Sequence, residues 1–322
     1  MNPTVSLDEM TAALRGNGGE LRAGGTDVTA RQRSGLAAGP FVDLNGAGAV
    51  PAGIEWRADG SARIGALATV AAIAADPMLA ASYPALTATA GALATPQIRA
   101  AGTLGGNLLQ RNRCWYYRNP HFSCFQTGGD GCPARDGLNL YSAVIDQGPC
   151  VAPHASSLAM ALLAYDARVE VHGRGTVAVH ELYGDGSDPT RDHLLDAGEV
   201  LLAVELPAPV PGERAAYHRA ISRAEAEWPL VEAVARLVVD GSTITLAAVA
   251  VGGVAHTPLR LPEVEAALVG QPTAPGQLPA QLLAAAQTAT QRCEPLAQTG
   301  YKVDLLRDTV LEVVERAAAP PP

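Results

Sequence analysis

The chain of 322 residues is 48% hydrophobic and 17% charged and has a net charge of −9, a balance typical of globular proteins with sizeable cores. It has no Lys/Arg-rich run of the kind that binds nucleic acid, and no apolar run of the roughly 18 residues that a membrane span needs. The segment MNPTVSLDEM lacks a basic stretch followed by an apolar one, so we expect no signal peptide. We therefore expect the protein in the cytoplasm, or in the periplasm if a signal-bearing partner exports it.

Short helices and strands alternate in the first part of the chain. SLDEMTAALRGN predicts a helix that begins with a capping box of Ser6 and Glu9, and a short strand and the glycine turn AGGTD follow it. FVDLNG predicts a strand. ARIGALATVAAIAAD predicts a strand and then an Ala-rich helix capped by Thr69, and YPALTATAGALA predicts a helix that ends before Pro96.

The second half predicts two further groups of elements. SSLAMALLAYDARVEVHGRGTVAVHEL predicts helix, strand, turn and strand, so the G-x-G-x-x-A string at 173–178 is interpreted as a hairpin and not as a dinucleotide fingerprint. The proline-rich tract 206–213 predicts a domain boundary. After it, AYHRAISRAEAEWPLVEAVARLVVD and STITLAAVAVGGVA predict a helix and strands. PEVEAALVG and VDLLRDTVLEVVERAAA predict two late helices, and the terminal PPP is expected to fray.

Two glycine motifs, AGGTD at 23–27 and TLGGN at 103–107, are candidate binding turns. Glycine allows positive φ and close approach of a ligand, and successive backbone N–H groups in such turns suit a pyrophosphate. Two such turns about 80 residues apart in sequence can hold one dinucleotide from both sides. The alternative is that both are ordinary tight turns, since each motif alone is a weak signal.

Four of the five cysteines fall within one segment, in the spacing C-x9-C-x7-C-x17-C: Cys114, Cys124, Cys132 and Cys150. The segment is rich in Gly, Pro and Asn and has little apolar periodicity, so a thiolate-held metal centre is expected to order it. Zinc sites usually contain paired C-x2–4-C knuckles, and none is present, which favours an iron–sulfur cluster. Four free buried cysteines are the alternative, and Cys293 is expected to be a small buried residue.

These residues resemble the medium, FAD-binding subunits of the xanthine dehydrogenase and carbon monoxide dehydrogenase family. The similar segments run in order over nearly the whole chain: RAGGTDV, FVDL, RIGALATV, PQIRAAGTLGGNLLQ, LLAVELP and YKVDLLRDTV. The resemblance implies an α+β fold, with a two-lobed FAD-binding domain of the PCMH/vanillyl-alcohol-oxidase type over residues 1–208 and a smaller C-terminal α+β domain over 213–322. It places a cysteine-rich insertion at about 111–152.

The resemblance also implies which residues bind FAD. They are Arg22, Ala23, Gly24, Gly25, Thr26, Asp27, Val28, Leu93, Thr103, Gly105, Gly106, Asn107, Ser157, Leu202 and Lys302. The chain departs from the family where a Ser-Asp pair reads Ser156-Ser157, and where Tyr-x-Lys reads Tyr217-His218-Arg219. A serine bonds ribose more weakly than a carboxylate does. The later acidic-aromatic pair, Glu227-Trp228, keeps the family's character.

The cysteine segment resembles the insertion that carries a [4Fe–4S] cluster in flavin subunits of periplasmic aldehyde oxidoreductases; the flavin subunit of 4-hydroxybenzoyl-CoA reductase is the alternative. The resemblance then implies an electron-transfer subunit of a heterotrimer, in which a large subunit holds the molybdenum cofactor and a small subunit holds [2Fe–2S] clusters. Substrate oxidation would occur on the partner, so we expect no catalytic side chain here and interpret His121 and His154 as polar loop residues. A zinc-stapled binding module and a self-sufficient flavin oxidase are the competing functions.

Overall fold

The computed structural model describes residues 6–17, 19–45, 48–272 and 278–319, so the predicted fraying of the terminal prolines falls outside the described residues. The chain begins with a small unit in which two short parallel strands pair. Its elements are α1 (Leu7–Asn17), β1 (Glu20–Arg22), α2 (Val28–Arg33) and β2 (Phe41–Asp43). The Ser6 hydroxyl accepts from the Glu9 N–H and the Glu9 carboxylate accepts from the Ser6 N–H, which confirms the predicted capping box.

A five-stranded antiparallel sheet in the order β3-β4-β7-β5-β6 forms the base of the second lobe. Its strands are β3 (Ile54–Trp56), β4 (Ala62–Gly65), β5 (Arg168–His172), β6 (Gly175–Ala178) and β7 (Val200–Leu206). Strands β5 and β6 pair around Gly173, which has a φ of +90°. The predicted hairpin is therefore confirmed, and the short helix η2 (Val179–Leu182) follows it.

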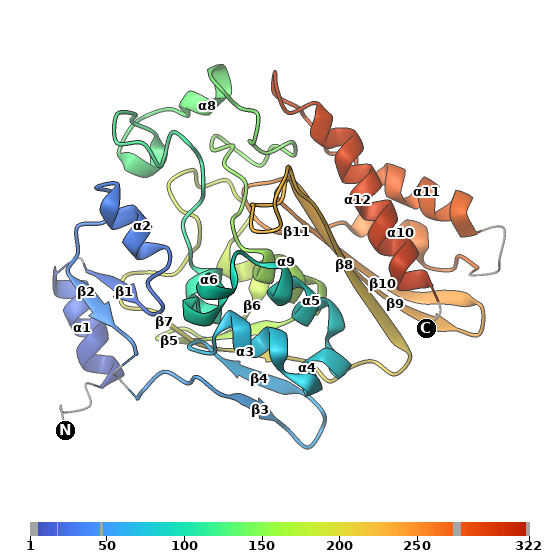
Figure 1. The fold of residues 1–322 in the computed structure, drawn as a ribbon, viewed down its shortest axis with the longest axis horizontal. Helices are drawn as coiled ribbons and strands as arrows, with labels where there is room; N and C mark the ends of the chain where they lie inside the picture. Colours follow the sequence, from blue (N-terminus) through green and yellow to red (C-terminus); the bar gives the residue numbers. More distant parts are fainter. Residues whose placement is uncertain (1–5, 18, 46–47, 273–277, 320–322) are drawn as a thin grey trace.

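Six helices of this lobe lie above that sheet (Figure 1). They are α3 (Val70–Ala75), α4 (Pro77–Ser82), α5 (Pro84–Ala92), α6 (Pro96–Ala101), α7 (Leu104–Leu108) and α9 (Ser157–Ala164). The Thr69 hydroxyl caps α3 by accepting from the Ala72 N–H, as predicted. Every residue of α9 is buried, as expected of a helix that is apolar on all sides.

The C-terminal part is a four-stranded antiparallel sheet in the order β11-β10-β9-β8. Its strands are β8 (Glu213–Ala220), β9 (Val231–Asp240), β10 (Thr243–Gly252) and β11 (Leu259–Arg260), and its helices are α10 (Pro262–Leu268), α11 (Leu278–Thr288) and α12 (Tyr301–Ala318). Helix α12 packs on β8 and β9, whereas α5 and α9 pack from the other lobe. The prediction of a helix directly after the proline-rich tract is wrong, because that stretch forms β8. The sequence did not predict α11.

The cysteine segment joins the two parts of the molecule. Between α7 and α9 its regular elements are only η1 (Phe125–Thr127) and α8 (Pro133–Asp136). It reaches the C-terminal part through Val144 and Ile145, whose N–H groups donate to the Val254 carbonyl. This segment therefore helps to hold the lobe of the five-stranded sheet to the C-terminal sheet. In the described part of the chain, no helix is long and apolar enough to cross a membrane.

Candidate cofactor site

The first glycine motif leaves no room for a side chain where it meets the end of α6, just before the second motif. A Cβ on Gly24 would lie 1.8 Å from the Ala101 carbonyl oxygen, at the end of α6. Gly25 has a φ of +71°, which side-chain-bearing residues rarely adopt. The turn therefore requires glycine at both positions, because one needs close backbone approach and the other needs left-handed backbone.

The second motif begins the short helix α7. The Thr103 hydroxyl accepts from the Gly106 N–H at 3.1 Å, and a Cβ on Gly105 would lie 3.1 Å from the Cβ of Ala66. The Asn107 amide oxygen accepts from the Ser156 hydroxyl at 2.7 Å. The motif is thereby tied to the start of α9.

Two cavities, of about 480 and 280 Å³, meet at these motifs. Their shared lining residues are Thr26, Asp27, Thr103, Gly106 and Gln110. The larger cavity extends between α1 and the loop before β7, and the smaller extends to Leu93, Arg219 and Trp228. The result is one elongated depression with both glycine motifs at its middle, a shape that suits a dinucleotide.

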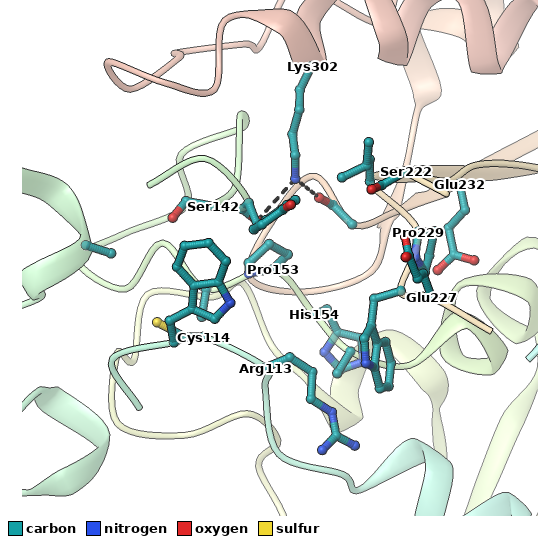
Figure 2. Close-up of a pocket in the computed structure, with 18 of the residues that line it drawn as sticks. Arg113, Cys114, Ser142, Pro153, His154, Ser222, Glu227, Pro229, Glu232 and Lys302 are labelled. Atoms are coloured by element: carbon teal, nitrogen blue, oxygen red, sulfur yellow. Dashed lines mark hydrogen bonds between the residues drawn. The ribbon is translucent and has the colours of Figure 1, made fainter. Parts of the chain in front are cut away.

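A third cavity, of about 310 Å³, adjoins the smaller one, and Figure 2 shows the residues that line it. The two share Arg113, Glu227, Trp228 and Pro229. Figure 2 shows Lys302 entering it from α12, with its ammonium donating to the Gly253 and Tyr141 carbonyls at 2.8 and 3.3 Å.

Three buried ionisable groups line this third cavity. Burial lowers the pKa of Lys302 to about 7 and that of His154 to about 3. Burial raises the pKa of Glu232 to about 7, against the Ser157 and Tyr217 side chains, which lower it. His154 Nε2 is buried and has no hydrogen-bond partner among the described residues, so the cavity offers polar atoms that a ligand would satisfy.

Asp27 ties the first glycine motif to the cysteine segment. Its carboxylate lies 2.7 Å from Arg113, 2.8 Å from Arg118 and 3.0 Å from Arg31, and the Arg111 N–H also donates to it. Burial alone would raise the pKa of Asp27, but Arg113 and Arg118 outweigh it and the pKa is lowered. This ionised carboxylate holds the segment against the cofactor depression.

Most of the residues that the sequence predicts for cofactor binding line these cavities: Ala23, Gly24, Gly25, Thr26, Asp27, Val28, Leu93, Thr103, Gly105, Gly106, Asn107 and Lys302. The other three predicted residues, Arg22, Ser157 and Leu202, line none of these cavities. Arg22 is ion-paired with Asp43, Ser157 is buried at the start of α9, and the Leu202 carbonyl accepts from the Ala66 N–H.

Sequence reasoning missed two residues of the site. Arg113 lines two of the cavities, and its guanidinium stacks 4.6 Å from the Trp228 ring centre. Glu232 lines the third. A signal existed for each: Arg113 belongs to the basic run RNR next to Cys114, and Glu232 is the lone acid in the apolar strand LVEAVARLVV.

The four clustered cysteines line one small cavity together with Tyr116, Tyr117 and Phe125. None of them forms a disulfide, and burial raises the pKa of Cys114 and Cys150 to about 11. Across the described ranges, no group of three or more His, Cys, Asp or Glu side chains is arranged to hold a metal ion. Cys293 is half-buried and lies apart from the other four cysteines; its backbone pairs with that of Ile145 in an isolated β-bridge.

Comparison with known proteins gives consistent matches along the chain. Residues 3–209 match the family model described as the FAD binding domain in molybdopterin dehydrogenase, and residues 215–317 match the CO dehydrogenase flavoprotein C-terminal domain. The aldehyde oxidoreductase FAD-binding subunit PaoB of Escherichia coli (strain K12) is 31% identical over 316 residues, which cover 96% of this chain and 94% of that protein. The putative xanthine dehydrogenase FAD-binding subunit XdhB of the same strain is 25% identical, over 93% of this chain and 89% of that protein.

Solved structures share the fold. A chain of the reconstituted CO dehydrogenase from Oligotropha carboxidovorans matches with a TM-score of 0.74 at 24% identity, over 98% of this chain and 96% of that one. A chain of quinoline 2-oxidoreductase from Pseudomonas putida 86 matches with a TM-score of 0.74 at 21% identity, over 98% and 94%. The predicted α+β architecture is confirmed.

Proposed function

The chain belongs to the family of FAD-binding subunits of molybdenum hydroxylases of the xanthine dehydrogenase and CO dehydrogenase type, and on this premise we propose that it is the electron-transfer subunit of a heterotrimer of the aldehyde oxidoreductase kind. In this proposal it passes electrons from [2Fe–2S] clusters of a small subunit, through FAD, to an acceptor. The molybdenum cofactor and substrate oxidation belong to a large partner subunit. The observation that carries the proposal is the elongated depression centred on two glycine motifs.

The residues of the depression fit FAD. A Cβ on Gly24 or Gly105 would fill the space that these glycines leave open beside the backbone. A buried nitrogen of Arg113 in the depression, and one of His154 in the adjoining third cavity, have no partner among the described residues. Thr26, Thr103 and Asn107 would bind the phosphate and ribose groups. Bound FAD would supply the two-electron chemistry, while the side chains bind and orient it.

We further propose that Cys114, Cys124, Cys132 and Cys150 hold a [4Fe–4S] cluster. The support is that all four cysteines line one cavity. A cluster contains several atoms, so its cysteine ligands lie further apart than the ligands of a single metal ion do. The cavity is small, about 20 Å³, so the segment would widen around a cluster, as expected when ligand binding and loop folding are coupled. Asp27 would transmit that ordering to the first glycine motif through Arg113 and Arg118.

Iron and flavin contents of anaerobically purified variants test both proposals. Cys132→Ser is expected to lose the iron and keep FAD, because Cys132 lies outside the glycine motifs. Cys293→Ser is the matched control, since Cys293 is a half-buried cysteine outside the cluster segment, and it should keep both. Unchanged iron in Cys132→Ser would show that the ligand assignment is wrong.

Two further outcomes separate the competing functions. Colourless protein with one zinc per chain would indicate the binding module. Oxidation of aldehydes or purines by the isolated chain would indicate a self-sufficient flavin oxidase. Co-purification with a molybdenum subunit and a [2Fe–2S] subunit is the result that the heterotrimer predicts.

A further inference from the structure

Glu232 is a buried carboxyl group near the start of β9, an inner strand of the C-terminal sheet. It lies on β9, is 3% exposed, and has Arg219 on β8 and Gly252 on β10 as its cross-strand neighbours. A Cβ on Gly252 would lie 2.7 Å from Glu232 Oε1, so a side chain there would displace the carboxyl. Burying such a group is costly unless partners bind it.

The protein supplies only part of the hydrogen bonding that this carboxyl can accept. The Tyr217 hydroxyl donates to Oε2 at 2.9 Å, and the Ser157 side chain lies near enough to lower the pKa of the carboxyl. A carboxylate has about four acceptor positions. The single hydrogen bond from Tyr217 therefore leaves acceptor capacity on the carboxyl, and Glu232 lines the third cavity.

The carboxyl group is linked to the second glycine motif through the start of α9. The Ser157 side chain lies near Glu232, the adjacent Ser156 donates to Asn107, and Asn107 lines the cofactor depression. The third cavity also adjoins that depression, since Arg113 and Trp228 line both. A ligand held by the glycine motif can thus reach Glu232.

We propose that Glu232 is a cofactor-binding carboxylate, which accepts a hydrogen bond from an O–H or N–H donor of FAD and supplies from β9 the negative charge that Ser157 lacks. The inference rests on the proposed function, because it takes FAD to be the ligand. It accounts for a buried acid that has hydroxyl groups beside it and lines a cavity. It also explains how the site tolerates serine where we expected a carboxylate.

The proposal predicts a pH dependence of FAD binding. A hydrogen bond donated by FAD favours the ionised carboxylate, so binding releases a proton and affinity rises as pH rises through about 7, the pKa of Glu232 without ligand. The other groups that face it are Tyr217 and Arg219 on β8 and Ser157 on α9, while Gly252 on β10 brings none. Across the cavity lie His154, Glu227 and Lys302. Lys302 titrates in the same pH range, since its pKa is also about 7. The contribution of Glu232 is therefore the part of the pH dependence that a Glu232 variant loses.

FAD titration of apoprotein, followed by flavin fluorescence, tests the inference. Glu232→Gln should bind FAD about ten-fold or more weakly above pH 7, as expected for loss of a charge-assisted hydrogen bond, and its affinity should vary less with pH. Glu225→Gln, which removes an exposed acid outside these cavities, should bind as the wild type does. Thermal unfolding of the Glu232→Gln apoprotein should be no lower than wild type, because a buried ionisable group is replaced by a neutral one.

A further control moves the acidic side chain from position 232 to position 157. Glu232→Ser should bind FAD weakly, and the double variant Ser157→Asp/Glu232→Ser should bind about ten-fold more tightly than Glu232→Ser alone. Wild-type affinity and an unchanged pH profile in Glu232→Gln would overturn the inference and leave the proposed function standing. A wild-type chain that binds no FAD would overturn both. Repeating the titration with riboflavin locates the donor, since a loss seen with FAD alone places it on the adenosine part.

Discussion

The contact between the first glycine motif and the end of α6, which leads into the second motif, makes Gly24→Ala an informative perturbation. The added Cβ would lie 1.8 Å from the Ala101 carbonyl oxygen, whereas real Cβ contacts are not shorter than 3.0 Å. The obstacle is backbone and not a flexible side chain, so the turn and the end of α6 must separate by about 1.2 Å. Overpacking of this kind costs about 1–3 kcal/mol of stability, and we expect FAD affinity to fall about ten- to a hundred-fold because the two motifs no longer match one ligand.

The assay is FAD titration of the apoprotein together with denaturant unfolding. Gly16→Ala is the matched control, because Gly16 lies in α1 with nothing within 4 Å of its would-be Cβ. That change should leave FAD affinity unaltered and stabilise the helix by about 0.5–1 kcal/mol. Wild-type FAD affinity and stability in Gly24→Ala would refute the argument that this contact sets the spacing of the two motifs around one ligand.

Two further predictions concern stability. Glu213→Gln should destabilise the chain by up to about 3–5 kcal/mol in denaturant unfolding, because the buried Arg236 loses the carboxylate that it binds at 2.6 Å and keeps only the longer ion pair with Asp166 at 3.5 Å. An unchanged midpoint would show that the Glu213–Arg236 pair is dispensable. Lys302 has a folded-state pKa lowered from 10.5 to about 7, so the unfolded chain binds more protons between these values and wild-type stability should gain from Lys302 as pH rises from about 7 towards 10.5. Lys302→Met should lack that gain, and a parallel pH profile in both proteins would contradict the assignment.

Local chemistry explains what the sequence could predict. The capping box of Ser6 and Glu9, the Thr69 cap and the hairpin at Gly173 depend on neighbouring residues, and all three are confirmed. The glycine motifs are recognisable because only glycine permits their backbone contacts. The domain boundaries and the assignment of individual cofactor-binding residues stay predictions.

Tertiary contacts explain what the sequence did not show. The stretch ERAAYHRA contains good helix formers, but it pairs with β9 along its whole length and becomes β8, so long-range pairing overrides local propensity. In the sequence, Glu232 is an isolated acidic residue in an apolar strand. Only the fold shows that Ser157 and Tyr217 lie beside it. Arg113 and Asp27 are 86 positions apart in the sequence, and no local pattern indicates that they form an ion pair.

Native mass spectrometry of the anaerobically purified chain tests the central claim most directly. An FAD subunit that also holds a [4Fe–4S] cluster should appear at the mass of the polypeptide plus one FAD and one such cluster, and Cys132→Ser should lose the cluster mass alone. A chain that carries no FAD at any stage of purification, or that carries one zinc ion in place of a cluster, would contradict the account.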